Sequence, residues 1–256
     1  MSFEINKIYN KNCIDFIKTL PDNCLDLIIA DPPYNKNVAY WDNMNNKEYI
    51  NMMKVLAKEF KRTLKGDGSV FIYNQQPMAS AMFVIFYEEL NYVDEIIWHY
   101  RNGGGNPKNK CKNVHQLLYW FSKNKEYKSN IDSIRQPYSG TRAIYKGNID
   151  KNPSKAWKPN EKGALPTNVW EISIVRQKES TPLAKISVQK PLEICNRIIN
   201  VGSNPNDLVY IPFAGSGSEI ESCIKNNRNY IATELDNNYI EDIIIPRINS
   251  INKRGI

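Results

Sequence analysis

The tetrapeptide Asp31-Pro32-Pro33-Tyr34 directly follows an apolar run from Leu25 to Ala30. A short apolar run that ends at a double proline is typical of a buried strand followed by a rigid turn. Such a turn presents a carboxylate, carbonyl oxygens and an aromatic face at one place. These groups suit a planar ring that carries an amine, because the oxygens accept its N–H bonds and the aromatic face stacks on it. A purely structural turn, in which Asp31 caps a backbone group, explains the tetrapeptide equally well.

A second group of residues that could bind a ligand lies between Leu208 and Glu234. The pattern is a strand, a glycine turn, a helix and a second strand that ends in an acidic residue. The glycines let the backbone approach a bound molecule closely, and the helix offers its N-terminal N–H groups. Glu234 is placed to accept hydrogen bonds from ribose hydroxyls. The turn comprises Pro212, Phe213, Ala214, Gly215, Ser216, Gly217 and Ser218, and the whole unit predicts a nucleoside-containing cofactor.

Two common nucleotide motifs do not match this turn. The NAD fingerprint requires a third glycine where Ile220 stands, and the phosphate loop of nucleotide hydrolases requires a Gly-Lys-Ser/Thr that does not follow. A nucleoside cofactor without a pyrophosphate fits better. S-adenosyl-L-methionine is the common cofactor of this kind.

Strands and helices alternate around both groups. Strands are predicted at 3–9, 25–30, 69–73, 93–100, 114–121, 208–211 and 230–234, and helices at 14–20, 46–64, 78–90, 191–200, 219–225 and 239–248. Lys65-Gly66-Asp67-Gly68 is predicted to end a helix and turn into the next strand. The segment 129–180 has little periodicity. This alternation predicts an α/β fold with a mostly parallel sheet.

The composition limits the classes of protein that need to be considered. The 256 residues suffice for one domain, or for one domain with an inserted lobe, and the apolar runs are too short to span a membrane. The N-terminus lacks a signal-peptide pattern. Five scattered cysteines and two histidines make a structural zinc site an unfavourable interpretation, so no metal is expected. A reduced, cytoplasmic chain with free thiols follows as the simplest expectation.

The positive charge of the chain is regional. From Trp98 to Lys190 there are 18 basic and 6 acidic residues, a net charge of +12, whereas the whole chain carries only +7. A concentrated basic segment in an otherwise acidic chain is typical of a surface that binds a polyanion. A solvated basic surface without a partner is the plainer alternative.

Taken together, these motifs resemble the amino-group DNA methyltransferases, which transfer a methyl group from S-adenosyl-L-methionine to an exocyclic amine. Asp31-Pro32-Pro33-Tyr34 resembles the catalytic motif of that family, and Phe213 to Ser218 resembles its cofactor motif. Val188-Gln189-Lys190-Pro191 resembles a segment that closes the cofactor site, and Asn12 to Asp15 also looks familiar. The order of the motifs is that of the β class, and the chain is similar to short restriction-modification adenine methyltransferases of the MboII type. The resemblance implies a Rossmann-like methyltransferase fold.

The resemblance also assigns roles along the chain. Residues 1–100 would form the catalytic half of the methyltransferase domain, 101–185 a basic target-recognition region and 186–256 the cofactor-binding half. The catalytic residues would be Asp31, Pro32, Pro33 and Tyr34, with Tyr34 stacked on a flipped adenine of double-stranded DNA. The cofactor would contact Cys13, Asp31, Lys190, Phe213, Ala214, Gly215, Ser216, Gly217, Ser218 and Glu234, with Asp15 beside the pocket. Arg101, Arg135, Arg142 and Trp157 are candidate DNA contacts. A second copy of the chain and a cognate restriction endonuclease are candidate partners.

Several features keep different interpretations open. Lys190 would meet the methionine carboxylate, although a surface lysine is the plainer expectation. The family usually has aspartate where Ile211 stands and threonine where Ser218 stands, and before Gln189 it usually has His-Pro-Thr rather than Ile186-Ser187-Val188. A lost carboxylate at Ile211 suggests weaker cofactor binding or a catalytically impaired DNA-binding subunit. An N4-cytosine methyltransferase, in which serine more often replaces Asp31, and an enzyme that acts on RNA or on a protein amide also stay open.

Overall fold

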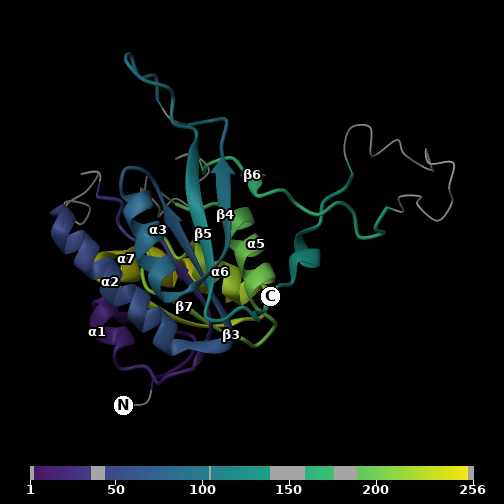
Figure 1. Cartoon of the computed structure of the whole chain (residues 1–256). Helices are drawn as coiled ribbons and strands as arrows, with labels where there is room; N and C mark the ends of the chain where they lie inside the picture. Colours follow the sequence, from purple (N-terminus) through teal and green to yellow (C-terminus); the bar gives the residue numbers. More distant parts are fainter. Residues whose placement is uncertain (1–2, 36–43, 104, 139–158, 176–188, 253–256) are drawn as a thin grey trace, which may run out of the picture.

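Eight strands form one sheet in the order β1-β8-β7-β2-β3-β5-β4-β6 in the computed structural model, which describes residues 3–35, 44–103, 105–138, 159–175 and 189–252 (Figure 1). The strands are β1 (Lys7–Asn10), β2 (Leu25–Ala30), β3 (Leu64–Asn74), β4 (Asn91–His99), β5 (His115–Ser122), β6 (Val169–Glu171), β7 (Leu208–Ile211) and β8 (Asn229–Glu234). Only the two pairings of β5, with β3 and with β4, are antiparallel among the described strands. The predicted α/β fold with a mostly parallel sheet is confirmed.

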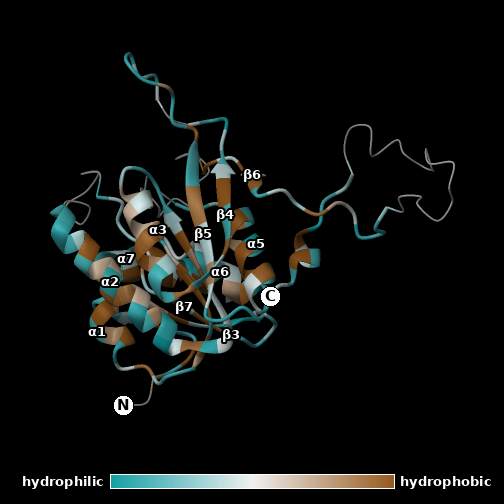
Figure 2. Ribbon diagram, in the orientation of Figure 1, coloured by the Kyte–Doolittle hydropathy of each residue, from teal (hydrophilic) through white to brown (hydrophobic). Residues whose placement is uncertain are grey.

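Helices cover both faces of the sheet. They are α1 (Cys13–Ile17), α2 (Asn46–Thr63), α3 (Met78–Glu89), α5 (Leu192–Gly202), α6 (Ser218–Lys225), α7 (Asn237–Tyr239) and α8 (Ile245–Asn252), with a π-helical turn at Ile240–Ile244 and a 3-10 turn at Ile131–Ile134. Alternate residues of β2 pack in opposite directions. Ile28 belongs to the core beneath α1, α2 and α3, and Leu27 to the core beneath α5 and α6. The apolar strands therefore lie between two helical layers (Figure 2).

The sequence explains where two of these helices begin. The side chain of Asn12 accepts a hydrogen bond from the backbone N–H of Ile14 at the start of α1. Asn45 caps α2 in the same way, with bonds from the N–H groups of Lys47 and Glu48. Both are N-caps that satisfy backbone donors with no partner inside the helix. The α1 cap matters most for function, because it fixes the loop that leads from β1 into the helix.

The adjacency of β2 and β7 is anchored at the amino ends of both strands. Asp26 is buried, and its carboxylate receives hydrogen bonds from Lys65 at 2.8 Å, from Lys128 at 2.5 Å and from the backbone N–H of Leu208 at 2.9 Å. Lys128 also binds Asp207, at 2.9 Å. Burial alone would raise the pKa of Asp26, but the two lysines lower it below its ordinary value. The ionised carboxylate thus ties the two central strands together.

Two predictions about the elements are wrong in detail. The predicted turn at 65–68 lies inside β3, which begins at Leu64 and pairs there with Leu25. A Cβ at Gly68 would lie 3.0 Å from the backbone oxygen of Asp26, so glycine serves here for close strand contact rather than for a turn. The missed strand β6 pairs with β4 in parallel, and the carbonyl of Ile172 accepts a hydrogen bond from Trp98 Nε1 at 2.7 Å. No described helix is long and apolar enough to cross a membrane.

Candidate active site

The sheet reverses its strand order between β2 and β7, and a cavity opens there. From β2 the chain crosses through α2 to β3 on one side, and from β7 it crosses through α6 to β8 on the other. Ligands of open α/β sheets bind outside the carboxyl ends of the strands at such a point. The cavity has a volume of about 240 Å³. Its walls are Lys11, Asn12, Cys13, Asp31, Pro33, Met44, Met52, Lys190, Pro212, Phe213, Ala214, Gly215, Ser216, Glu219, Glu234, Leu235, Asp236 and Tyr239.

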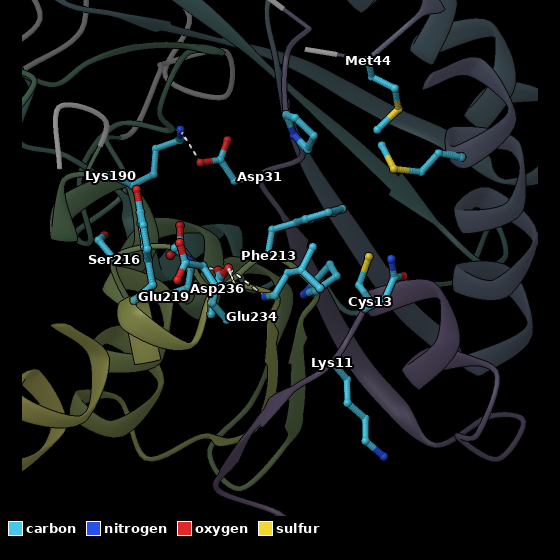
Figure 3. Close-up of a pocket in the computed structure, with 18 residues that line it drawn as sticks. Lys11, Cys13, Asp31, Met44, Lys190, Phe213, Ser216, Glu219, Glu234 and Asp236 are labelled. Atoms are coloured by element: carbon cyan, nitrogen blue, oxygen red, sulfur yellow. Dashed lines mark hydrogen bonds and ion pairs between the residues drawn. The ribbon is translucent and has the colours of Figure 1, made fainter. Parts of the chain in front are cut away.

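Asp31 leaves the end of β2 and enters an ion pair with Lys190 in the cavity wall. Its Oδ2 lies 2.6 Å from Lys190 Nζ. Figure 3 shows the two side chains pointing toward each other from segments that are far apart in the sequence. Lys190 is only 5% exposed, so the expectation of a surface lysine is wrong. The ammonium group also lies 4.8 Å from the ring centroid of Tyr73, a cation–π distance. Lys190 is therefore a buried counter-ion of Asp31.

Tyr34 is tied to Asp31 by its hydroxyl group. The hydroxyl donates a hydrogen bond to Asp31 Oδ1 at 2.7 Å, so both carboxylate oxygens have a partner. Lys190 Nζ lies 3.3 Å from the same hydroxyl. Burial, and next the charge of Asp31, raise the pKa of Tyr34 well above its ordinary value, which keeps the phenol a hydrogen-bond donor. Asp31 is thus held in one orientation by a cation and a phenol.

The glycine turn after β7 is shaped by two left-handed residues. Gly215 has φ +47° and Gly217 has φ +72°, a backbone region that glycine enters without strain. A Cβ on Gly215 would meet no atom within 4 Å, whereas one on Gly217 would lie 3.1 Å from Ile244 Cγ2. Gly215 therefore leaves open space beside the cavity, and Gly217 allows close packing against the π-helical turn.

Glu234 reaches this turn from the end of β8. Its Oε2 accepts a hydrogen bond from the backbone N–H of Gly215 at 2.8 Å, and its Oε1 accepts bonds from the N–H groups of Leu235 and Asp236. The carboxylate oxygens have room for about four hydrogen bonds in total, so a ligand can still be accepted. The acid is consequently fixed in place and still able to bind hydroxyl groups.

Arg247 on α8 stabilises the glycine turn by hydrogen bonds. This buried side chain donates hydrogen bonds to the Ser216 carbonyl at 2.5 Å, to Glu221 Oε2 at 2.6 Å and to Ser218 Oγ at 3.3 Å. The ion pair with Glu221 joins α8 to α6. None of this was predicted from the sequence, because Arg247 lies 31 residues from Ser216 along the chain.

Glu219 brings another carboxyl group into the cavity wall. It is the second residue of α6, is 5% exposed, and its Oε1 lies 3.6 Å from Cys195 Sγ. Burial, followed by the charge of Asp31, raises the pKa of Glu219 to about 7, while its own backbone N–H and the charges of Lys190 and Arg247 act in the opposite direction. An acid on the first turn after the glycines was the sequence signal for this residue, and the sequence reasoning missed it.

The structure gathers most of the predicted site residues in one place. Asp31, Pro33, Cys13, Lys190, Phe213, Ala214, Gly215, Ser216 and Glu234 line the cavity. Pro32, Tyr34, Gly217 and Ser218 do not line it, but Tyr34 binds the lining residue Asp31 and Ser218 Oγ lies 3.1 Å from Oγ of the lining residue Ser216. Asp15 is exposed on α1 and also does not line it. Of the other lining residues that were missed, Leu235, Asp236 and Tyr239 closely follow Glu234 in the sequence, whereas Lys11, Asn12, Met44 and Met52 come from the first quarter of the chain.

Ile211 occupies a different environment from the one the resemblance implied. It is the last residue of β7, is 1% exposed, and belongs to the core beneath α5 and α6. It does not line the cavity. Glu219, eight residues further on, does place a carboxyl group there. The acidic character of the cavity therefore does not depend on residue 211.

The candidate DNA contacts lie away from the cavity or outside the described residues. Arg101 is exposed and its Nε lies 2.8 Å from Glu171 Oε1. Arg135 is largely buried and binds Asp132 and the carbonyl of Gly163, so its guanidinium is already engaged. Arg142 and Trp157 lie outside the described residues. Within the described part of the chain, no three His, Cys, Asp or Glu side chains are placed to hold a metal ion.

Sequence comparisons connect this arrangement with known proteins. A family model described as a DNA methylase, for N6 and N4 amino groups, matches residues 25–245. The chain is 34% identical to the type II methyltransferase M1.MboII of Moraxella bovis, over 93% of this chain and 94% of the relative. It is 29% identical to the DNA adenine methyltransferase YhdJ of Escherichia coli (strain K12), over 93% of this chain and 81% of the relative.

Solved structures agree on the fold. The PvuII DNA methyltransferase (cytosine-N4-specific) superposes with a TM-score of 0.68 at 17% identity, covering 99% of this chain and 93% of that one. A DNA modification methylase of Thermus thermophilus, crystallised with S-adenosyl-L-methionine, gives a TM-score of 0.63 at 16% identity and covers 97% of this chain and 96% of that one. The Rossmann-like fold is thus confirmed over nearly the whole chain.

Proposed function

Because the chain belongs to the DNA methylase family that modifies N6 and N4 amino groups, we propose that it methylates the N6 amine of adenine in double-stranded DNA. The cofactor is S-adenosyl-L-methionine. The relatives that are named type II methyltransferases support a place in a restriction-modification system. The observation that carries the proposal is a single cavity in which Asp31 faces the glycine turn, although 184 positions separate Asp31 from Gly215.

The residues of the cavity fit this cofactor. Gly215 leaves open space where any side chain would intrude, and Glu234 is fixed so that its remaining lone pair can accept a hydrogen bond from a ribose hydroxyl. Lys190 would hold the methionine carboxylate with its third N–H donor, since the other two face Asp31 and the Tyr34 hydroxyl. When bound, the cofactor supplies an electrophilic methyl group on a sulfonium sulfur.

Asp31 has the central role in the chemistry. The lone pair of an exocyclic amine is delocalised into the ring, so the amine is a poor nucleophile. Asp31, together with a carbonyl of Pro32 or Pro33, would accept its N–H bonds and so direct the nitrogen lone pair. Asp31 or water would then take up the proton that the methylated nitrogen loses. This is catalysis by positioning and electrostatics, without a covalent intermediate on the protein.

Lys190 and Tyr34 would prepare Asp31 for this role. Their contacts keep the carboxylate in place before the substrate arrives, which reduces the reorganisation needed during reaction. An adenine inside a duplex cannot reach a cavity at the end of the sheet, so the target base has to leave the stack. Stacking of Tyr34 on that base remains a prediction, as do the DNA contacts and the division into residues 1–100, 101–185 and 186–256.

The choice of adenine rests on two observations. The tetrapeptide carries aspartate at Asp31, where the N4-cytosine subgroup more often has serine, and YhdJ is named a DNA adenine methyltransferase. The likeness to PvuII methyltransferase concerns the fold only. A homodimer and a cognate endonuclease remain predictions.

The test is direct. The purified full chain is incubated with S-adenosyl-L-methionine and unmethylated DNA, and the digested nucleosides are identified by mass spectrometry. N6-methyladenine is the expected product, whereas N4-methylcytosine would overturn the choice of base. Calorimetry with the cofactor alone tests for an inactive DNA-binding subunit, because a subunit with an impaired cofactor site would give no heat. Asp31→Ala should still bind the cofactor and should lose methyl transfer.

A further inference from the structure

Glu219 is a buried carboxyl group that the proposed chemistry does not use. Its side chain is 5% exposed and lines the cavity. Among the described side chains, Cys195 is its hydrogen-bond partner, with Sγ 3.6 Å from Oε1. A thiol is a weak donor, and an ionised carboxylate that is buried without strong partners is unfavourable. Glu219 therefore needs a partner that these side chains do not provide.

The two cations that act on Glu219, Lys190 and Arg247, already have other partners. Lys190 is paired with Asp31 at 2.6 Å, and Arg247 is paired with Glu221 at 2.6 Å and with the Ser216 carbonyl. No ion pair within 4.0 Å connects either of these two described cations to Glu219, although both act on it through space. Among the described residues neither cation is free to pair with Glu219, so a positively charged donor group of a ligand in the cavity would supply the partner.

We propose that Glu219 binds the α-ammonium group of the methionine part of S-adenosyl-L-methionine. An α-amino acid carries a cation and an anion on one carbon atom, and Glu219 and Lys190 offer the opposite pair of charges in one cavity wall (Figure 3). The sulfonium is also cationic but has no N–H to donate, whereas an ammonium offers three donors. This inference rests on the proposed function and assigns a further cofactor-binding residue to its site.

The inference predicts a pH dependence of cofactor affinity. The groups that act on Glu219 are Asp31 and Tyr34 after β2, Tyr73 on β3, Lys190 and Cys195 at α5, Cys223 on α6 and Arg247 on α8. Burial raises the pKa of the thiols and phenols among them, so these stay neutral between about pH 6 and 8. Glu219, with a pKa of about 7, changes its charge in this range.

The expected change in cofactor affinity follows from the ionisation of Glu219 and of the α-amino group of the ligand. At pH 6 only about a tenth of Glu219 is ionised, and at pH 7.5 about three quarters is. The α-amino group of the ligand begins to lose its proton near pH 8, which partly offsets the gain. Affinity at pH 7.5 should therefore be about fivefold higher than at pH 6.

Calorimetry on the full chain tests this with three ligands at both pH values. S-adenosyl-L-methionine has the sulfonium and the amino acid, S-adenosylhomocysteine has only the amino acid, and methylthioadenosine has neither. The wild type should show the fivefold change with the first two ligands and none with methylthioadenosine. Glu219→Gln should lose the pH dependence and bind the first two about tenfold more weakly at pH 7.5, because a neutral amide accepts a weaker hydrogen bond.

The controls separate a binding role from a structural one. Gln in place of Glu219 keeps an oxygen for Cys195, and a thermal melt verifies its folding. Glu193→Gln removes an exposed acid on α5 and should behave as the wild type does. The inference is overturned if Glu219→Gln weakens methylthioadenosine equally, if it keeps the pH dependence, or if only the sulfonium ligand shows that dependence. If the wild type binds none of the three ligands, the proposed function fails as well.

Discussion

The buried carboxyl of Glu219 should make the ligand-free protein less stable as the pH rises. Its pKa is about 7 in the folded chain against an ordinary value of 4.5, so the folded state binds this proton more tightly than the unfolded state. The stabilisation is complete below about pH 4.5 and is lost as the pH rises through 7. Between pH 6 and 8 the group should lower the free energy of unfolding by about 1.3 kcal/mol. For a chain of this size that corresponds to roughly 3–5 °C in Tm.

The assay is urea denaturation at pH 6 and pH 8 without ligand, for the wild type, Glu219→Gln and Glu193→Gln. Glu219→Gln removes the titrating group and keeps the shape of the side chain, so its stability should change about 1.3 kcal/mol less between the two pH values. Any other group that titrates in this range is present in all three proteins, so its contribution cancels in the difference. If Glu219→Gln loses as much stability as the wild type on raising the pH, the buried carboxyl is not the cause and the reasoning is wrong.

Three further predictions concern the site and the DNA. Lys190→Met leaves Asp31 without its cation, so the free energy of unfolding should fall by about 2–3 kcal/mol in urea denaturation and methyl transfer should drop. Gly217→Ala should cost about 1–2 kcal/mol of stability in the same assay, because its φ is +72° and a Cβ would press on Ile244. Gly215→Ala, at φ +47°, carries similar backbone strain and should in addition weaken cofactor binding in calorimetry, because its Cβ enters the open space beside the cavity. Raising salt from 50 to 200 mM should weaken DNA binding by about a thousandfold in a filter or anisotropy assay if the basic segment contacts about six phosphates; a flat response would contradict a phosphate-binding role.

Most of the sheet could be predicted from local signals. β2 and β7 are apolar runs bounded by Pro or Gly, and the helices around them follow the apolar period of about 3.6 residues. The errors occur where pairing between distant segments decides the structure. Gly66 and Gly68 look like a turn, but pairing of Leu64 with Leu25 extends β3 through them. The three residues of β6 carry too little pattern to predict a strand without β4 beside them.

Site residues that belong to a sequence motif could be predicted, whereas those that only packing brings to the site could not. Asp31, the glycine turn and Glu234 are found by their order along strands and turns, and the structure brings them to one cavity. The ion pair of Asp31 with Lys190 depends on two segments that have no sequence signal in common. Glu219 and Arg247 were missed for the same reason, since burial rather than residue type makes them significant.

Because β2 lies in the middle of the sheet, its two neighbouring strands are synthesised at different times. All six residues of β2 are buried, and β3 supplies one neighbour early. The other neighbour, β7, is made only later, since Leu208 follows Asp26 by 182 residues. At ordinary translation rates this is a delay of roughly 10 to 40 seconds. Throughout it the apolar strand β2 lacks one of its two neighbours, and the glycine turn and Glu234 of the cavity are likewise made only in the last quarter of the chain.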